Sequence, residues 1–264
     1  MTLTYLGTAS VLIDTGSVRV LTDPVLDEPG GTYDMGPAWA PAGWFGSTRS
    51  HPTPIPAAAL GAVDVALLSH DHHFDNLDYA GRAFVLGRSV DTIVTNTASA
   101  RRLAPLKRDV RGLATGESTT AAGIRITATP ARHGPRLTPQ VGQVSGFLLE
   151  GSHIPTIWFS GDTVMTPRLR HWLTAERHID VAIIACGAVR FPSAPILSKA
   201  RFTFDPAEVV DAALALNPRM LIPVHRSGWT HFASEGPLRD AINAAGLEPR
   251  TRWLEPGESV SIST

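Results

Sequence analysis

Cysteine is almost absent from this chain, whose 264 residues include a single thiol, Cys186. One cysteine excludes a disulfide framework within the chain, which is typical of proteins in a reducing compartment. No apolar run approaches the roughly 18 residues that a helix needs to cross a bilayer. The first residues, MTLTYLGTASVLIDTG, lack the basic and long apolar stretches of a signal peptide. We therefore expect a cytoplasmic protein without a transmembrane segment.

Charge is also sparse in this sequence. Charged residues make up 18% of the chain, the net charge is −1, and no long basic run occurs. Nucleic acid or an anionic membrane is therefore not indicated as the main partner, and we expect a small-molecule substrate. Hydrophobic residues make up 43%, enough for a substantial core, and the length favours one domain spanning residues 1–264. A homo-oligomer is left open by these properties.

Short apolar runs separated by turn residues predict strands throughout the chain, and four runs between them predict helices. Strands come first and a mixture of strands and helices follows, which favours an α/β fold with two sheets covered by helices. The expected strands are residues 10–15, 18–22, 63–70, 91–97, 123–134, 146–150, 156–163, 181–187 and 219–225, and the expected helices are 77–86, 98–103, 205–216 and 237–245.

The connection from residue 23 to residue 60 is long and rich in glycine, proline and tryptophan. A connection of this length inside a compact domain is usually functional. Four aromatic residues in it are candidates to cover a pocket: Tyr33, Trp39, Trp44 and Phe45.

The stretch LLSHDHHFDNLD, residues 67–78, places three histidines within four residues, directly after an apolar run. These imidazoles, His70, His72 and His73, have the carboxylates Asp71 and Asp75 beside them. Such a cluster is poorly suited to a core and is unusual on a surface, so it indicates a metal or catalytic site. Its position at a strand end suits that role, because the sheet holds such residues rigidly.

Other ligand-type residues also follow apolar strands, namely His133, Asp162, the segment Gly187 to Arg190, and His225. A lone residue of this kind, such as His133, has a structural role more often than a metal-binding one, and these residues gain weight only together with the histidine cluster. Converging on the histidine cluster, they would provide nitrogen and oxygen ligands for one or two divalent ions. Zn is the ion most favoured by such a set, with Mn or Fe as alternatives.

These motifs, taken in order, resemble the metallo-β-lactamase superfamily. LLSHDHHFDNLD is similar to the SHxHxDHLD motif of the branch that contains ascorbate-6-phosphate lactonases and the phospholipase D acting on N-acyl phosphatidylethanolamines. GTASVLIDTGSVRVLTDPV resembles the opening of that branch, and TPARHG, SGDT and IPVH follow in the family's order. The resemblance covers nearly the whole chain. It implies a four-layer αβ/βα sandwich in which two mixed sheets, flanked by helices, hold the metals between them.

The histidine cluster departs from the family pattern by one residue. His70 follows Ser69 as the first histidine of the pattern should, whereas Asp75 and Asn76 come one residue late. With one inserted residue, the ligands are His70 and His73, and this is the frame that we favour. His72 in place of His73, or Asp71 in the uninserted frame, are the alternatives.

The resemblance then implies two metal positions of different strength. The first would use His70, His73, His133 and Asp162, and the second would use Asp75, Asn76, His225 and the bridging Asp162. Because Asn76 offers a neutral amide where the family has an imidazole, the second position is expected to be weaker or to prefer a harder ion. A site with a single ion is the alternative.

The predicted activity is that of a metal-dependent hydrolase acting on a small ester, lactone or phosphodiester. Water activated by the metal would attack the substrate, Asp162 would bridge the ions, and Asp75 would orient the water or act as base. Supporting or pocket residues are expected at Asp23, Arg190, Trp229 and His231. The alternative is a degenerate member of the fold that holds one ion or none and binds a ligand without turnover.

Overall fold

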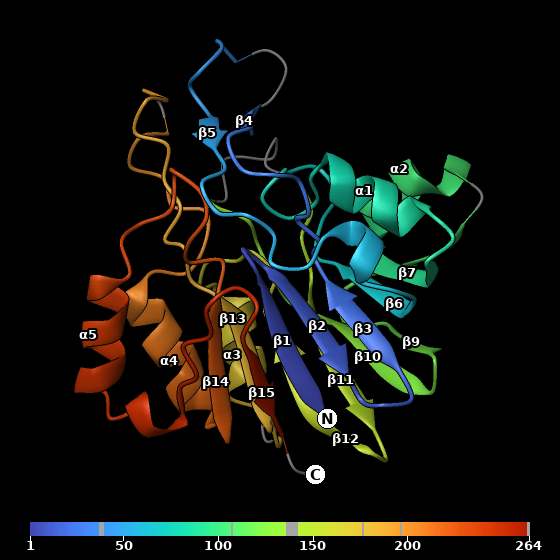
Figure 1. The fold of residues 1–264 in the computed structure, drawn as a ribbon. Coiled ribbons are helices and arrows are strands. Elements are labelled where there is room, and N and C mark those ends of the chain that lie inside the picture. Colours follow the sequence, from blue (N-terminus) through green and yellow to red (C-terminus); the bar gives the residue numbers. More distant parts are fainter. Residues whose placement is uncertain (37–39, 107, 136–141, 176, 196, 263–264) are drawn as a thin grey trace.

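Two mixed β-sheets form the centre of the molecule (Figure 1). The computed structural model describes residues 1–36, 40–106, 108–135, 142–175, 177–195 and 197–262. Trp39, one of the aromatic residues expected to cover a pocket, lies outside these ranges. In spatial order the seven-stranded sheet consists of β15 (Ser259–Ser261), β1 (Thr2–Gly7), β2 (Ser10–Asp14), β3 (Arg19–Thr22), β6 (Val63–Leu68), β7 (Val90–Asn96) and β8 (Asp109–Leu113).

The strands of the second sheet all lie between residues 118 and 224. Its strands β9 to β12 pair antiparallel, whereas β12, β13 and β14 run parallel. In spatial order this six-stranded sheet consists of β14 (Met220–Val224), β13 (Val181–Ala185), β12 (Ile154–Phe159), β11 (Gly146–Gly151), β10 (Ile124–Thr129) and β9 (Ser118–Ala121).

Side chains that alternate along each strand separate two cores. In β6, Val65 and Leu67 face the second sheet, whereas Ala66 and Leu68 pack toward helices. This is the period-two pattern of a strand buried on both faces. The helices against the first sheet are α1 (Tyr79–Leu86) and α2 (Thr97–Leu103), and those against the second are α3 (Pro167–Leu173), α4 (Pro206–Leu216) and α5 (Gly236–Ala244).

The layers therefore run helix, sheet, sheet, helix, as Figure 1 shows with α4 and α5 on one side and α1 and α2 on the other. This arrangement confirms the predicted αβ/βα sandwich. Helix α4 has a capped N-terminus, because the Asp205 side chain accepts from the backbone N–H of Glu208 and Pro206 occupies the first turn.

The long connection between β3 and β6 contains a small hairpin that the sequence did not predict. It consists of β4 (Thr32–Asp34) and β5 (Gly46–Thr48), and a short 3-10 helix, η1 (Ala57–Ala59), follows. A further short helix, η2 (Ala104–Leu106), extends α2, and η4 (Glu248–Arg250) follows α5. The hairpin stands above the two sheets, at the end where β6, β12, β13 and β14 finish (Figure 1).

No helix among the described residues is long and apolar enough to cross a membrane.

Candidate metal centre

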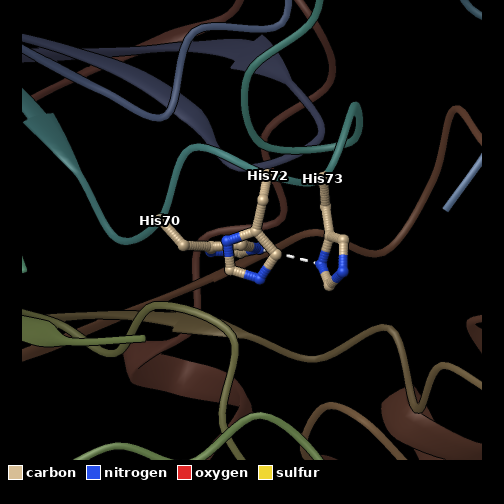
Figure 2. Close-up of side chains that lie close together, drawn as sticks. All are labelled: His70, His72 and His73. Atoms are coloured by element: carbon tan, nitrogen blue, oxygen red, sulfur yellow. Dashed lines mark hydrogen bonds between the residues drawn. The ribbon is translucent and has the colours of Figure 1, made fainter. Parts of the chain in front are cut away.

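The loop that follows β6 carries the histidine cluster, and its three rings lie close together. Figure 2 shows His70, His72 and His73 gathered on the same side of the loop, with His70 joined to His73. The ring centroids of His70 and His73 are 4.9 Å apart and their planes are nearly perpendicular. The loop thus presents several imidazole edges to one point, as the sequence predicted.

Three imidazole nitrogens from two different sheets converge there. Nδ1 of His73 lies 3.1 Å from Nε2 of His70 and 2.9 Å from Nε2 of His133, which follows β10. Nitrogens that share one tetrahedral Zn ion, each about 2.0–2.1 Å from it, lie about 3.3 Å apart. The distances from the His73 nitrogen to the other two are therefore close to the spacing that one ion requires.

Hydrogen bonds behind two of these rings fix which nitrogen carries the proton. Nδ1 of His133 lies 2.8 Å from the carbonyl oxygen of Phe202 and must donate to it, because a carbonyl only accepts. Ser69 Oγ donates to Asp23 over 2.6 Å, so Nδ1 of His70, 2.8 Å from that hydroxyl, donates to Ser69. In both rings Nε2 keeps its lone pair and faces the cluster.

Burial keeps these imidazoles neutral. Desolvation, reinforced by the neighbouring rings, holds the pKa values of His70 and His73 well below the usual value for histidine. Desolvation likewise lowers the pKa of His133 to about 4. Neutral imidazole is the form that binds a metal, so no proton has to be displaced from these rings near neutral pH.

A second group, rich in oxygen, adjoins the first. Nε2 of His225, just after β14, lies 3.3 Å from Asp75 Oδ2 and 3.2 Å from Asp162 Oδ2. The same Asp162 oxygen lies 3.9 Å from Nε2 of His133. Asp162, which follows β12, therefore stands between the two groups, in the place expected of a bridging carboxylate.

The charges in the second group are mutually dependent. Burial raises the pKa of Asp162 to about 6. Burial acts in the same direction on Asp75, but the His225 and His231 imidazoles outweigh it and hold the pKa of Asp75 well below its usual value. Burial would lower the pKa of His225, but the carboxylates of Asp162 and Asp75 outweigh it and raise that pKa.

Several buried polar atoms of the second group lack a hydrogen-bond partner among the described residues. They are Oδ1 of Asp75, Oδ1 of Asn76, both carboxylate oxygens of Asp162 and both ring nitrogens of His225. Leaving a buried polar atom unpaired costs about 1–3 kcal/mol. Because several such atoms lie together here, they indicate a site for a cation. The donor set is nitrogen and oxygen only, which suits Zn, Mn or Fe.

Asn76 lies in this group with its two amide ends in different surroundings. Its Nδ2 donates to Asp23 Oδ2 over 3.0 Å, while its Oδ1 is one of the unpaired atoms. Asp23 also accepts from the Ser69 backbone N–H, and burial raises its pKa to about 7 despite these hydrogen bonds. Asp23 therefore supports both Asn76 and, through Ser69, the ring of His70.

The two alternative ligands, Asp71 and His72, have surroundings unlike those of His70 and His73. The Asp71 carboxylate is paired with Arg102, whose Nε is 2.9 Å from Oδ1, and a second arginine, Arg82, is 3.9 Å from Oδ2. Burial would raise the pKa of Asp71, but hydrogen bonds from His72 and Arg102 lower it. The ring of His72 stays close to His70 and His73, and its Nδ1 lies 3.5 Å from Nη2 of Arg102.

The predicted pocket residues separate into two kinds. His231 reaches the second group, with Nε2 at 3.0 Å from Asp75 Oδ2. Trp229 is buried, donates from Nε1 to Thr8 Oγ1 over 3.2 Å and packs against the ring of His231. Arg190 is exposed and donates to the Lys199 carbonyl, and no contact among the described residues joins it to the metal-binding groups.

Backbone strain gathers around the same site. His225 and Asp23 adopt positive φ angles, 54° and 28°, which non-glycine residues rarely do. The His225 N–H donates to the Thr8 carbonyl, which holds it in that conformation. Gly187, just after β13, leaves room for this turn, because a Cβ there would lie 2.6 Å from the His225 carbonyl oxygen.

The sequence pointed to the charged residues, with Asp23 and His231 among the supporting groups, but not to the neutral polar groups that orient them. Ser69, the Phe202 carbonyl and Ser47, which contacts His231, are ordinary residues whose roles arise from distant contacts. Only Ser69 carried a signal, because it stands between the apolar strand and the first histidine.

Comparisons with known proteins agree with this geometry. Residues 18–226 match the beta-lactamase superfamily domain. A UPF0173 metal-dependent hydrolase from Opitutus terrae is 28% identical over 270 residues, which cover 99% of this chain and 100% of that relative.

Two solved structures share the fold. The isothiocyanate hydrolase from Delia radicum gut bacteria has a TM-score of 0.79 at 20% identity, covering 100% of this chain and 99% of its own. A possible metal-dependent hydrolase from Veillonella parvula also has a TM-score of 0.79 at 20% identity, covering 99% of each chain. At this level of sequence identity the two structures support the fold alone. Because the matched domain spans most of its length, the chain belongs to the beta-lactamase superfamily and is a metal-dependent hydrolase of the metallo-β-lactamase fold.

Proposed function

We propose that this hydrolase uses two divalent ions to direct water onto a small ester, lactone or phosphodiester. The observation that carries the proposal is the convergence of three neutral imidazole nitrogens beside a group of buried, unpaired oxygens. The range of substrates follows from the resemblance of the LTDP and SHDHHFDN stretches to the lactonase and phospholipase D branch. Zn is the expected ion, with Mn or Fe as alternatives.

The ligand frame with one inserted residue fits these contacts best. The first position would consist of His70, His73 and His133, and the second of Asp75, Asn76 and His225, with Asp162 shared between them. Asp71 is a poor ligand in comparison, because Arg102 and Arg82 already balance its charge.

When bound, the ions would lower the pKa of water toward neutrality and polarise the oxygen of the attacked group. The protein's own residues would do the rest. Asp75 would orient the attacking water or act as its base, and Asp162 would contribute to both metal positions. Asp23, acting through Ser69, fixes the tautomer and the orientation of the His70 ring.

Metal analysis of protein purified without chelator or added metal tests this proposal. About two equivalents per chain support the dinuclear hydrolase, and about one indicates that only the first position is filled. A chain that holds no metal and shows no metal-dependent activity on lactone and bis-phosphoester panels contradicts the proposal.

A ligand-binding protein without turnover is the second candidate, and Asn76 motivates it. A weak second position would leave the attacked oxygen less polarised. This candidate is favoured if the protein binds one ion and the same substrate panels are bound but not hydrolysed.

A further inference from the structure

The long connection between β3 and β6 reaches the metal centre through one histidine. Nε2 of His231 lies 3.0 Å from Asp75 Oδ2, and its Nδ1 contacts Ser47 Oγ, which belongs to β5. Ser47 Oγ is in turn 3.2 Å from Thr230 Oγ1. A chain of polar contacts thus leads from the β4–β5 hairpin to a proposed metal ligand.

Packing leaves the His231 ring little freedom. Its side chain is 3% exposed, and its plane stacks on Phe191 with centroids 5.2 Å apart and an angle of 17°. Trp229 and Phe232 meet the ring edge-on, at centroid distances of 5.9 Å and 4.7 Å. The ring is therefore held on a face and on its edges, as a positioning group has to be.

Backbone pairing fixes the segment that carries the ring. Arg49 forms an isolated antiparallel bridge with Trp229, and the Thr230 N–H donates to the Thr48 carbonyl over 3.1 Å. The Ser50 N–H donates to the Gly228 carbonyl over 2.8 Å. The segment after β14 is thus paired through its backbone with the residues at the end of β5.

The positions of the protons on His231 follow from the chemistry of its two hydrogen-bond partners. A carboxylate only accepts, so Nε2–H of His231 donates to Asp75 Oδ2. In the neutral ring Nδ1 then accepts from the Ser47 hydroxyl. The other oxygen of Asp75, Oδ1, is left buried and without a hydrogen-bond partner among the described residues.

We propose that His231 is a positioning residue that orients the Asp75 carboxylate, and that Ser47 and the β4–β5 hairpin thereby tune the affinity of the second metal position. This inference rests on the proposed function, since it assigns Asp75 to that position. Residues that orient a ligand in this way commonly change metal affinity by about 10- to 100-fold when they are removed.

The test is a Zn²⁺ titration of metal-free protein against a competing chromophoric chelator, with two dissociation constants fitted. For His231→Ala we expect the second ion to bind roughly 10- to 100-fold more weakly and the first ion to bind within about twofold of the wild type. His231→Gln should recover most of the loss, because its amide N–H can donate to Asp75 where Nε2–H did. Ser47→Ala should weaken the second ion by less than His231→Ala does.

His178→Ala is the matched control. This imidazole also pairs with an aspartate, Asp180, at 3.0 Å, but it is exposed and remote from the metal-binding groups. Both ions should bind to this variant as they do to the wild type. Thermal unfolding of the metal-free variants reports separately on any loss of packing.

Three results overturn the inference: unchanged binding of the second ion in His231→Ala, parallel loss of both ions, or a loss that His231→Gln does not relieve. The proposed function fails in a different way. A wild-type chain that binds one ion removes the second position and this inference with it, yet leaves the first position standing. A wild-type chain that binds none removes both.

Discussion

Asp71 and His73 lie two residues apart in one loop, and their surroundings suit them to opposite tasks. Hydrogen bonds from His72 and Arg102 outweigh burial and keep the pKa of Asp71 low, and Arg102 and Arg82 balance the charge of its carboxylate. His73 instead faces two imidazoles, and burial keeps it neutral. Binding a metal stabilises a carboxylate little when arginines already pair with it. It stabilises neutral imidazole nitrogens that face one another much more.

Substituting these two residues should separate structure from metal binding. Asp71→Asn should keep its metal and lose roughly 1–3 kcal/mol of unfolding free energy, because charged hydrogen bonds to Arg102 are weakened. His73→Ala should lose the ion of the first position. Metal analysis together with urea unfolding of both variants measures the two effects. Loss of metal in Asp71→Asn alone would show that the uninserted frame is correct.

Asn76 is the residue that sets the difference in affinity between the two metal positions. An imidazole is a better ligand for Zn than an amide oxygen, so Asn76→His should bind the second Zn²⁺ roughly tenfold more tightly. Asn76→Ala should weaken it, and the Asp23 carboxylate would then lose a hydrogen bond as well. Two-site Zn²⁺ titration of the three proteins gives the order directly. Equal affinities in all three would show that Asn76 is no ligand.

At the scale of elements, the sequence predicts the strands that carry the site because apolar runs mark them and polar residues follow. His70, His133, Asp162 and His225 were all expected at strand ends and all lie there. The polar strand β9 and the short helix α3 were not expected, since neither has a clear apolar period. Their pairing and packing come from neighbours that are distant in the sequence.

The contact between Ser47 and His231 shows what sequence reasoning cannot reach. The two residues are 184 positions apart, and neither belongs to a recognisable motif. Their contact depends on a hairpin whose strands have only three residues each, too short for a periodicity to be seen. The ligands are predictable from the residue types that metals require, whereas the groups that orient them depend on the fold.

Helix α1 approaches the start of the long connection so closely that only glycine fits at one position. A Cβ on Gly81 would lie inside contact distance of the Pro24 carbonyl oxygen, and backbone atoms cannot yield as a flexible side chain can. Gly81→Ala should therefore lower the unfolding free energy by about 1–3 kcal/mol.

Gly236, at the start of α5, provides the comparison for Gly81. A Cβ there meets no atom within 4 Å, so Gly236→Ala should be neutral or slightly stabilising. Chemical denaturation of both variants measures the difference. Equal stability of the two variants would mean that α1 moves away from Pro24 without cost.

At the scale of the whole molecule, the metal centre joins the two sheets at one end. His70, His73, Asp75 and Asn76 follow a strand of the first sheet, whereas His133, Asp162 and His225 follow strands of the second. The core below them is apolar and packs the two sheets against each other. Bound ions would add cross-links at the end where charged groups of both sheets meet.

Removing metal should therefore destabilise the entire fold. A ligand that binds only the folded state, present at about 1,000 times its dissociation constant, adds about 4 kcal/mol of stability. For a chain of this size that corresponds to a fall in Tm on the order of 10 °C on chelation. Scanning calorimetry with and without EDTA, followed by addition of Zn²⁺, measures the shift and its reversal.

The double variant His133→Ala/His225→Ala is the control. Its Tm should equal that of the metal-free protein and should not change when EDTA is added, because each substitution removes a ligand that the second sheet supplies. If the Tm of the wild type does not change with EDTA or Zn²⁺, the converging nitrogens and oxygens do not need a bound ion for the stability of the fold.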